Sequence, residues 1–404
     1  MHRIACIALT PAGVELALRI ASGLMAGPAS VVAEVHMTSR LLADRAGMPP
    51  KEGGPAMAGF VTLADHMRAQ FAAYDGFVFV AATGIVVRTL APLLAGKTSD
   101  PAVVVCDQRG MHVISMLSGH LGGANALARQ VAVLTGGTPV ITTATDTENL
   151  PAIDLLAQQA GCALRDPHAI KAVSGALLRG EAVYLYDPAG VLDLPDDAAR
   201  HFVRVHDLAL VYGGADDGTG PAGGSACVVV DWRNHPPRQN VLRVVPRVVC
   251  GGVGCRRGTA CADIMGLLAV RLAAADAAPE SLAMLASADI KQDELGLVQA
   301  AGALGVVLHC FDSAALAAVD VPTPSPKAAA VLGVERVGVC EAAAMLGAAL
   351  CVTRGGGADS HSAPRQSADS LPLGVLIAPK AVAGGVTVAL AVPATYIVSI
   401  KDDA

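Results

Sequence analysis

The sequence contains few aromatic and few charged residues. Of its 404 residues, 3% are Phe, Trp or Tyr and 16% are charged, whereas 53% are hydrophobic. This composition excludes wholesale disorder and predicts a large core built mainly from Ala, Val and Leu. The net charge of -6 argues against a general nucleic-acid surface, because binding to a phosphate backbone needs clustered cations.

Several signatures of metal sites and catalytic sites are missing. None of the ten cysteines is spaced C-x-x-C, and no compact Cys/His quartet occurs. We therefore expect reduced cysteines that act as small hydrophobes, and no structural zinc site. The sequence also lacks a P-loop, an H-E-x-x-H motif and a G-x-S-x-G motif. No metal and no cofactor of its own is expected.

No stretch has the pattern of a signal peptide or of a membrane span. The opening MHRIACIALTP lacks a basic region followed by a long apolar run. The most apolar stretch, residues 76–95, contains Arg88 and is broken by Gly84 and Pro92. This pattern predicts a buried strand followed by a helix. The expectation is a cytoplasmic protein without membrane contact.

Short apolar runs rich in Val and Ile alternate with helical patterns in the first part of the chain. The predicted strands are 4–10, 30–38, 76–82, 102–107, 111–116 and 139–144, and the predicted helices are 14–25, 62–74, 85–94 and 124–136. This alternation is typical of parallel βαβ units. The pattern is less regular from about 146 to 246, where 182–187 is a predicted strand, and it then starts again.

The final part predicts strands at 247–254, 282–291, 306–311 and 386–392, with helices at 262–276 and 293–305. Thr259 is the predicted cap of the first of these helices. We predict a multi-domain α/β protein with an N-terminal α/β domain at 1–140, a middle region at 141–245 and a separate C-terminal α/β domain at 246–404.

The segment KTSDPAVVVCDQRGMHVISMLSGHLGGAN, residues 97–125, concentrates polar side chains around two strands. His120 is the candidate for proton transfer, because an imidazole titrates near pH 6.5. The glycines let the backbone approach a ligand, and the start of the next helix offers amides to an anion. The candidate catalytic residues are Lys97, Asp100, Asp107, Ser118 and His120, and the candidate binding residues are Arg88, Arg109, Gly122, Gly123 and Asn125. The alternative is a capped strand–loop–helix turn with a structural histidine.

A second polar cluster follows the predicted strand at 139–144. Thr142, Thr143 and Asp146 lie at its carboxyl end, where ligands bind in open α/β sheets. The alternative, slightly favoured by residue type alone, is that these side chains cap the next helix.

In the last part, GGVGCRRGT lies between a strand and a helix. Gly252, Gly254, Arg256 and Arg257 do not have the spacing G-x-G-x-x-G, and no ribose-binding acid follows at about 20 residues. A glycine loop with two guanidinium groups instead predicts a cradle for carboxylates. The alternative is a glycine turn with solvated arginines.

Two further residues are candidates for substrate binding. Lys291 lies at a strand end, in SADIKQDELGL. Glu341 lies at a helix start, where the helix dipole favours an acid in any case, so capping is its alternative role. The polar loop at 354–370 contains His361, which is predicted to be solvated.

Eight segments in order carry a family resemblance. IVVRTLAPLL, KTSDPAVVV, SGHLGGANALA and PVITTATD resemble the N-terminal half of the cobalt-precorrin-5A hydrolase family, and GVGCRRGT, SADIKQDELGL, GVERVGVCEAAAML and VTVALAVP resemble its C-terminal domain. The resemblance extends over most of the chain from 76 to 393. The loop at 354–370 looks longer than the family needs. The C-terminal domain also resembles a type found as a separate protein in the oxygen-dependent pathway.

The resemblance implies a substrate and a reaction. The substrate is a cobalt-bearing, ring-contracted tetrapyrrole with acetate and propionate arms, and the reaction opens a δ-lactone and releases acetaldehyde to give cobalt-precorrin-5B. Cobalt arrives with the substrate. In this scheme His120 is the general acid/base, Asp100 or Asp107 orients it or serves as the base, and Lys97 and Ser118 bind the lactone oxygen. The residues expected to hold peripheral carboxylates are Arg256, Arg257 and Lys291.

Two other functions fit the same residues. A non-catalytic tetrapyrrole carrier would use the cationic glycine loops without a base. A nucleotide-binding α/β protein would bind a dinucleotide, against which the loop spacing argues. The expected partners are the tetrapyrrole and, transiently, neighbouring enzymes of the pathway, with no nucleic acid.

Overall fold

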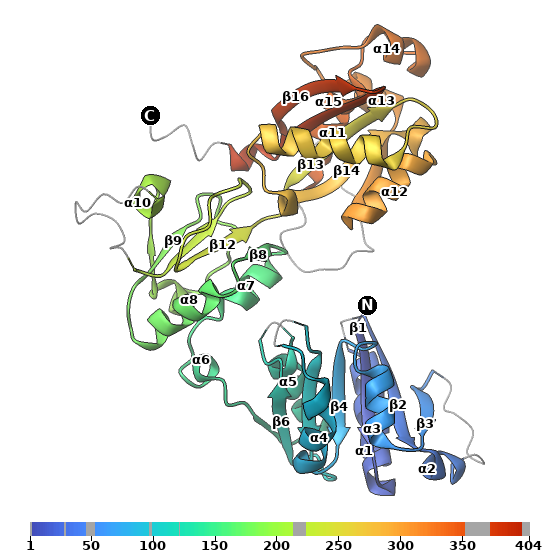
Figure 1. Cartoon of the computed structure of the whole chain (residues 1–404), viewed down its shortest axis with the longest axis vertical. Helices are drawn as coiled ribbons and strands as arrows, with labels where there is room; N and C mark the ends of the chain where they lie inside the picture. Colours follow the sequence, from blue (N-terminus) through green and yellow to red (C-terminus); the bar gives the residue numbers. More distant parts are fainter. Residues whose placement is uncertain are drawn as a thin grey trace. The chain divides into compact units, whose positions relative to one another are not determined.

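In the computed structural model, the described residues are 2–27, 30–45, 53–96, 99–120, 122–212, 224–351 and 372–397. They form three sheets with helices, which confirms the predicted multi-domain α/β class (Figure 1). Internal contacts divide the chain into two compact units, Met1–Leu155 and Leu156–Ala404.

The first unit is built on a seven-stranded sheet with the order β3-β2-β1-β4-β5-β6-β7. Its strands are β1 (His2–Ala8), β2 (Val31–Thr38), β3 (Ala56–Phe60), β4 (Gly76–Val80), β5 (Ala102–Cys106), β6 (His112–Leu117) and β7 (Thr138–Val140). Its helices are α1 (Pro11–Met25), α2 (Ser39–Ala43), α3 (Leu63–Gln70), α4 (Thr83–Leu90), the 3-10 turn η1 (Ala91–Leu93), α5 (Ala124–Thr135), α6 (Ala144–Thr147) and the start of α7 (Ile153–Gln159).

Helices cover both faces of this sheet. On one face α1 and α5 pack with Ala, Val, Leu and Ile of the central strands. On the other face α3 and α4 enclose a cluster that includes the aromatic side chains of Phe60, Phe71, Phe77 and Phe79. Because both faces are covered, β4 and β5 are buried along their whole length, which explains their continuous apolar sequences.

The pair β5–β6 is the exception to the parallel pairing of this sheet. These two strands are antiparallel, and all other neighbours in the sheet are parallel. The reversal is a tight turn in which Gly110 has a φ of 70° and the Asp107 carboxylate accepts the amides of Arg109 and His112. Consequently, the carboxyl ends of β6 and β7 lie at the edge where β1, β4 and β5 begin.

The second unit contains two five-stranded sheets. The first has the order β10-β9-β11-β12-β8, in which β8 is antiparallel to β12 and the other pairs are parallel. Its strands are β8 (Ala163–Arg165), β9 (Val183–Tyr186), β10 (Phe202–Arg204), β11 (Cys227–Val230) and β12 (Val241–Val245), and its helices are α8 (Ala169–Leu178), α9 (Asp196–Ala199) and α10 (Leu208–Tyr212).

The last sheet has the order β15-β14-β13-β17-β16, with parallel pairs on one side of β13 and antiparallel pairs on the other. Its strands are β13 (Val249–Cys255), β14 (Leu282–Ala288), β15 (Val307–Phe311), β16 (Val375–Ala383) and β17 (Val386–Val392). Its helices are α11 (Cys261–Ala274), α12 (Leu295–Leu304), α13 (Ser313–Ala317), α14 (Pro326–Leu332) and α15 (Val339–Cys351), with the 3-10 turns η2 (Pro279–Ser281), η3 (Asp289–Lys291) and η6 (Ala394–Tyr396).

The predicted helix cap at Thr259 is wrong. Helix α11 follows Ala260, which makes no side-chain cap, and the Thr259 hydroxyl donates instead to the carbonyl of Arg256.

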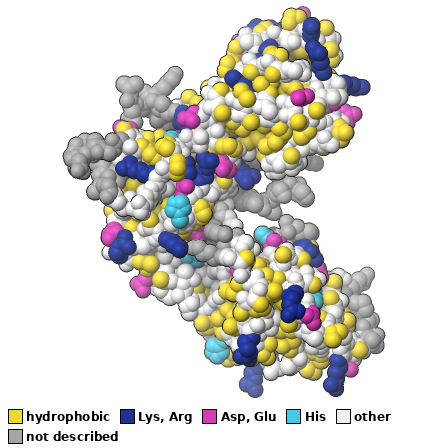
Figure 2. All heavy atoms as spheres, viewed as in Figure 1, with side chains coloured by type: hydrophobic (Ala, Val, Ile, Leu, Met, Phe, Trp, Pro, Cys, Tyr) yellow, Lys and Arg dark blue, Asp and Glu magenta, His cyan; other side chains and the backbone are white. Residues whose placement is uncertain are grey.

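Among the described residues, no helix has the length and apolarity needed to cross a membrane. On the face drawn in Figure 2, basic and acidic side chains are scattered among hydrophobic and uncharged atoms.

Candidate functional site

The site is centred on the loop that joins β6 to α5. Its backbone is left-handed at Ser118, with a φ of 58°, and at Gly123, with a φ of 83°. A Cβ added at Gly122 would lie 2.2 Å from the Cβ of Ser118, so the loop closes on itself where only glycine fits. The Ser118 hydroxyl donates to the Asp100 carbonyl over 2.8 Å, which ties the loop to the start of β5.

Two carboxylates face the His120 ring. Its Nε2 lies 2.9 Å from Oδ2 of Asp146, and the Thr145 hydroxyl is 3.3 Å from the same nitrogen. Its Nδ1 lies 3.7 Å from Oδ1 of Asp154, an ion-pair distance rather than that of a short hydrogen bond. The side chains of His120 and Asp146 are each 17% exposed, so the ring is mostly enclosed but still reaches solvent.

Asp146 is held by three donors. Arg129 Nη2 donates to its Oδ1 over 2.6 Å, and Asn125 Nδ2 and the His120 ring face its Oδ2. Asn125 is buried, and its carbonyl oxygen accepts from the Ser115 hydroxyl over 2.6 Å. The same amide also donates to the Thr143 hydroxyl at 3.2 Å. Strand β6, helix α5 and Thr143, just before α6, therefore fix one carboxylate against the imidazole.

These contacts shift the titration of both partners. Asp154 first, and Asp146 after it, raise the pKa of His120 above its usual value, and burial opposes them only partly. Burial alone would raise the pKa of Asp146, but the hydrogen bonds from Arg129 and His120 outweigh it and lower that pKa. The arrangement therefore favours an imidazolium flanked by two carboxylates, which can act as a proton donor.

The expectation that Asp100 or Asp107 orients His120 is corrected by the structure. The Asp100 carboxylate accepts the amides of Ala95 and Gly96 and shapes the loop before β5. Asp107 and Arg109 lie in the β5–β6 turn, at the opposite end of both strands from His120. The antiparallel hairpin separates residues that the sequence placed in one segment.

The other predicted residues of the first unit are dispersed. Arg88 is exposed on α4, with its guanidinium beside Gly84. Thr142 is exposed and Thr143 contacts Asn125, both before α6. Lys97 and the loop at 354–370 lie outside the described residues.

The glycines of the last sheet are not in a loop. Gly252 and Gly254 lie within β13, paired with Ala389 and Thr387 of β17. A Cβ at Gly252 would lie 1.8 Å from the Cys340 carbonyl oxygen, so this glycine permits α15 to approach the sheet. The predicted carboxylate cradle of glycine amides is therefore corrected at these two positions.

The three predicted cations of this region, Arg256, Arg257 and Lys291, lie in the segments that follow β13 and β14. Arg256 and Arg257 are exposed in the loop after the strand. Lys291 Nζ lies 3.0 Å from Oε2 of Glu294, whose other oxygen accepts the Gly258 amide over 2.8 Å. These contacts join the loops at the carboxyl ends of β13 and β14.

Glu341 lies fully buried at the first turn of α15. Its Oε2 accepts the amide and the hydroxyl of Thr323, and its Oε1 accepts the amide of Lys380. The predicted contact with substrate is corrected, because this carboxylate is enclosed and binds the backbone.

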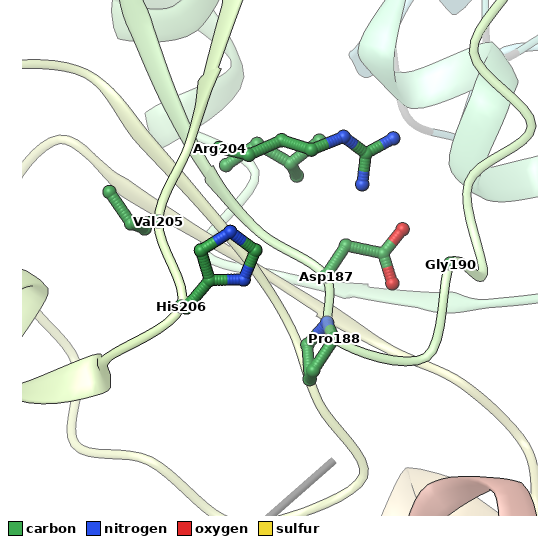
Figure 3. Close-up of a pocket in the computed structure, with 7 residues that line it drawn as sticks. Asp187, Pro188, Gly190, Arg204, Val205 and His206 are labelled. Carbon is green, nitrogen blue, oxygen red and sulfur yellow. The ribbon is translucent and has the colours of Figure 1, made fainter. Parts of the chain in front are cut away.

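A cavity of about 170 Å³ lies at the carboxyl ends of β9 and β10. Figure 3 shows Arg204, His206 and Asp187 around it. Both oxygens of Asp187 accept backbone amides, from Val191 and Leu192, so this carboxylate closes its own loop. The described residues contain no group of three or more His, Cys, Asp or Glu that could hold a metal ion.

Sequence reasoning missed Ser115, Arg129 and Asp154. Arg129 follows Asn125 by four residues, and this spacing on one helix face is a signal that could have found it. Asp154 has no comparable local signal, because it reaches His120 from α7.

Three family models match consecutive parts of the chain. The family models described as "Cobalamin synthesis G N-terminal", "Cobalamin biosynthesis central region" and "Cobalamin synthesis G C-terminus" match residues 65–146, 151–246 and 249–391. A similar solved structure is that of CobE, a protein from the cobalamin (vitamin B12) biosynthetic pathway, which is 29% identical, with a match covering 36% of this chain and 91% of that chain at a TM-score of 0.29.

Two curated relatives share the name cobalt-precorrin-5A hydrolase. The protein of Salmonella typhimurium is 38% identical over 317 residues, which are 78% of this chain and 83% of the relative. The protein of Priestia megaterium is 31% identical over 281 residues, which are 68% of this chain and 73% of the relative. The matches run through all three regions in order, and the chain belongs to the cobalt-precorrin-5A hydrolase family of cobalamin biosynthesis.

Proposed function

We propose that this chain is a cobalt-precorrin-5A hydrolase that opens the δ-lactone of its substrate and releases acetaldehyde, giving cobalt-precorrin-5B. The observation that supports this proposal best is the His120 ring between Asp146 and Asp154. It is a partly accessible acid/base group at the carboxyl ends of β6 and β7, within the region matched by the N-terminal family model.

The first step is hydrolysis of the lactone. Water adds to the lactone carbonyl and releases one proton to solvent, and the bond between the acyl carbon and the ring oxygen breaks. The acyl group becomes a carboxylic acid, and the departing oxygen needs a proton to become a hydroxyl. The His120 imidazolium donates this proton, which is the role favoured by its raised pKa.

The second step breaks a carbon–carbon bond. The neutral His120 takes the proton back from the hydroxyl, the C–O bond becomes C=O, and acetaldehyde leaves. The electron pair of the broken bond passes to the macrocycle, which then takes up a proton from solvent. One histidine thus serves both steps in turn, and its protonated form is restored at the end. Cobalt enters and leaves as part of the substrate.

Asp146 and its donors keep the ring in place during this exchange. Arg129 and Asn125 hold the carboxylate on both oxygens, so it stays directed at Nε2 of His120. We assign the cations Arg256, Arg257 and Lys291 to the carboxylate arms of the substrate. Arg256 and Arg257 are exposed, whereas Lys291 is half-buried beside Glu294.

The test measures acetaldehyde after the purified protein is mixed with cobalt-precorrin-5A in the absence of oxygen. We expect stoichiometric release by the wild type and a loss of about 10²- to 10⁴-fold in His120→Asn. The matched control is His112→Asn, which alters another histidine near an aspartate, Asp107, at the far end of β6 and should retain activity. Tight binding of the substrate without release by the wild type would favour a carrier instead.

A further inference from the structure

We propose that Asp154 is a positioning residue of this site: its charge keeps the proton on Nδ1 of His120, whereas Asp146 fixes the direction of the ring. The inference rests on the proposed function of His120, but its main test needs no enzymatic activity.

The geometry places one carboxylate at each ring nitrogen. Asp146 lies 2.9 Å from Nε2, and Asp154 lies 3.7 Å from Nδ1. The two aspartates come from different helices, α6 and α7. A neutral imidazole has one N–H and one acceptor nitrogen, and a carboxylate facing the acceptor nitrogen would be repelled. Both carboxylates are satisfied together only when His120 carries two protons.

The two carboxylates differ in how far other groups already neutralise their charge beside the His120 ring. Asp146 is already paired with the guanidinium of Arg129 at 2.6 Å and receives a further hydrogen bond from Asn125. In the part of the chain that the structure describes, the ion pair with His120 is the only one that Asp154 makes. The negative charge of Asp154 is therefore balanced by the His120 imidazolium alone among these described groups.

Burial strengthens the effect of Asp154. Its side chain is 7% exposed, against 17% for Asp146, so water and salt screen its charge less. The pKa of His120 agrees with this difference between the two carboxylates. Of the two, Asp154 raises that pKa more than Asp146 does.

Asp154 also lies in a different matched region. His120 and Asp146 fall within residues 65–146 of the N-terminal match, whereas Asp154 falls within residues 151–246 of the central match. The first helix of the central region thus completes a site whose other members lie in the preceding region.

The direct test follows the His120 ring by NMR in protein labelled with ¹⁵N-histidine, with its signals assigned from their absence in His120→Asn. We expect the titration of His120 to move to lower pH in Asp154→Asn, and to move less in Asp146→Asn. An unchanged titration in Asp154→Asn, or a larger shift in Asp146→Asn, would overturn the proposal.

The wild-type spectrum provides a second measurement that holds even if Asp154→Asn does not fold. At pH 6.5, where an ordinary imidazole is half protonated, more than half of the His120 rings should carry protons on both nitrogens. A mainly neutral ring with a single N–H at that pH would contradict the role of Asp154.

Kinetics separate this inference from the proposed function. If His120 donates a proton in the first step, the alkaline limb of the pH–kcat profile reports its protonated form. Asp154→Asn should move that limb to lower pH, with a kcat loss above it of about tenfold for each pH unit of displacement. Asp154→Glu should restore part of the limb, because it returns the charge. If the wild type releases no acetaldehyde, the proposed function fails, but the NMR titration still decides the role of Asp154.

The matched control is Asp231→Asn. Asp231 is another buried aspartate bonded to a histidine, with its Oδ2 2.7 Å from Nε2 of His235 in the second unit. This variant should leave the His120 titration and the alkaline limb in place. An equal shift in Asp231→Asn would mean that any buried Asp–His change disturbs the site indirectly, and the specific role of Asp154 would be rejected.

Discussion

The imidazoles of His36 and His66 face each other across strand β2 and helix α3, with Nδ1 of His36 2.8 Å from Nε2 of His66. His36 is 2% exposed, and its other nitrogen faces Glu34 and the Tyr74 hydroxyl. Arg3 completes the surroundings through its ion pair with Glu34. One hydrogen bond between two imidazoles needs a donor on one ring and an acceptor on the other. If both His36 and His66 become protonated, neither ring has an acceptor nitrogen and this hydrogen bond is lost.

This pair predicts that acid destabilises the first unit. Burial first, and Arg3 in addition, lower the pKa of His36 although Glu34 opposes them; burial and the charge of His36 lower the pKa of His66. The unfolded chain therefore binds protons more readily than the folded one. Stability is complete above the unfolded value of about 6.5 and falls as the pH drops below it.

Thermal melting of the wild type between pH 8 and pH 5 checks this expectation. His66→Gln keeps a donor for His36 but removes one titrating ring, so its melting temperature should depend less on pH. His112→Gln changes a histidine whose side chain is 69% exposed, and its slope should match the wild type. Equal slopes in all three proteins would refute the role of the pair.

Arg129→Met should lower activity without preventing binding. The variant removes the guanidinium from Oδ1 of Asp146 but keeps an unbranched side chain on α5. Asp146 then loses a fixed orientation, and its pKa should rise because the hydrogen bond from Arg129 lowers it in the wild type. We expect a loss in kcat of about tenfold or more with little change in KM, measured as acetaldehyde release. A larger effect on KM would place Arg129 on the substrate instead.

Gly252→Ala should destabilise the last sheet. The new Cβ would lie 1.8 Å from the carbonyl oxygen of Cys340 and 2.6 Å from the amide nitrogen of Ala344, so α15 must move. We expect a cost of about 1–3 kcal/mol or more in the free energy of unfolding, measured by denaturant titration. Gly266→Ala on α11 meets no atom within 4 Å and should stabilise by about 1 kcal/mol. The opposite order of the two variants would exclude close packing as the reason for Gly252.

Arg256 and Arg257 offer a test of substrate binding. Because both are exposed, changing them to Gln should leave folding intact. If they hold carboxylate arms, the double variant should raise KM by about tenfold, keep kcat, and show a weaker dependence of KM on salt. Arg179→Gln, which removes an exposed pair with Glu181, is the matched control. An unchanged KM in the double variant would remove these arginines from the substrate site.

The sequence by itself predicted the elements whose signals are local. The runs GFVFV and AVVVC are apolar at every position and are buried strands, because helices cover both faces of their sheet. The pattern SGHLGGAN predicts a loop between a strand and a helix, and in the structure Gly122 and Gly123 supply conformations and space that larger residues lack. His120 was singled out because of its chemistry.

The tertiary structure alone decided which side chains meet. Asp107 lies 13 positions from His120 but at the other end of a hairpin, whereas Asp154 lies 34 positions away and faces the ring. Gly252 has the local pattern of a loop, yet α15, formed almost ninety positions later, makes it the close contact of a strand. Sequence patterns determine backbone conformation over one or two turns, but contacts across a sheet depend on strand order and direction, which no local pattern contains.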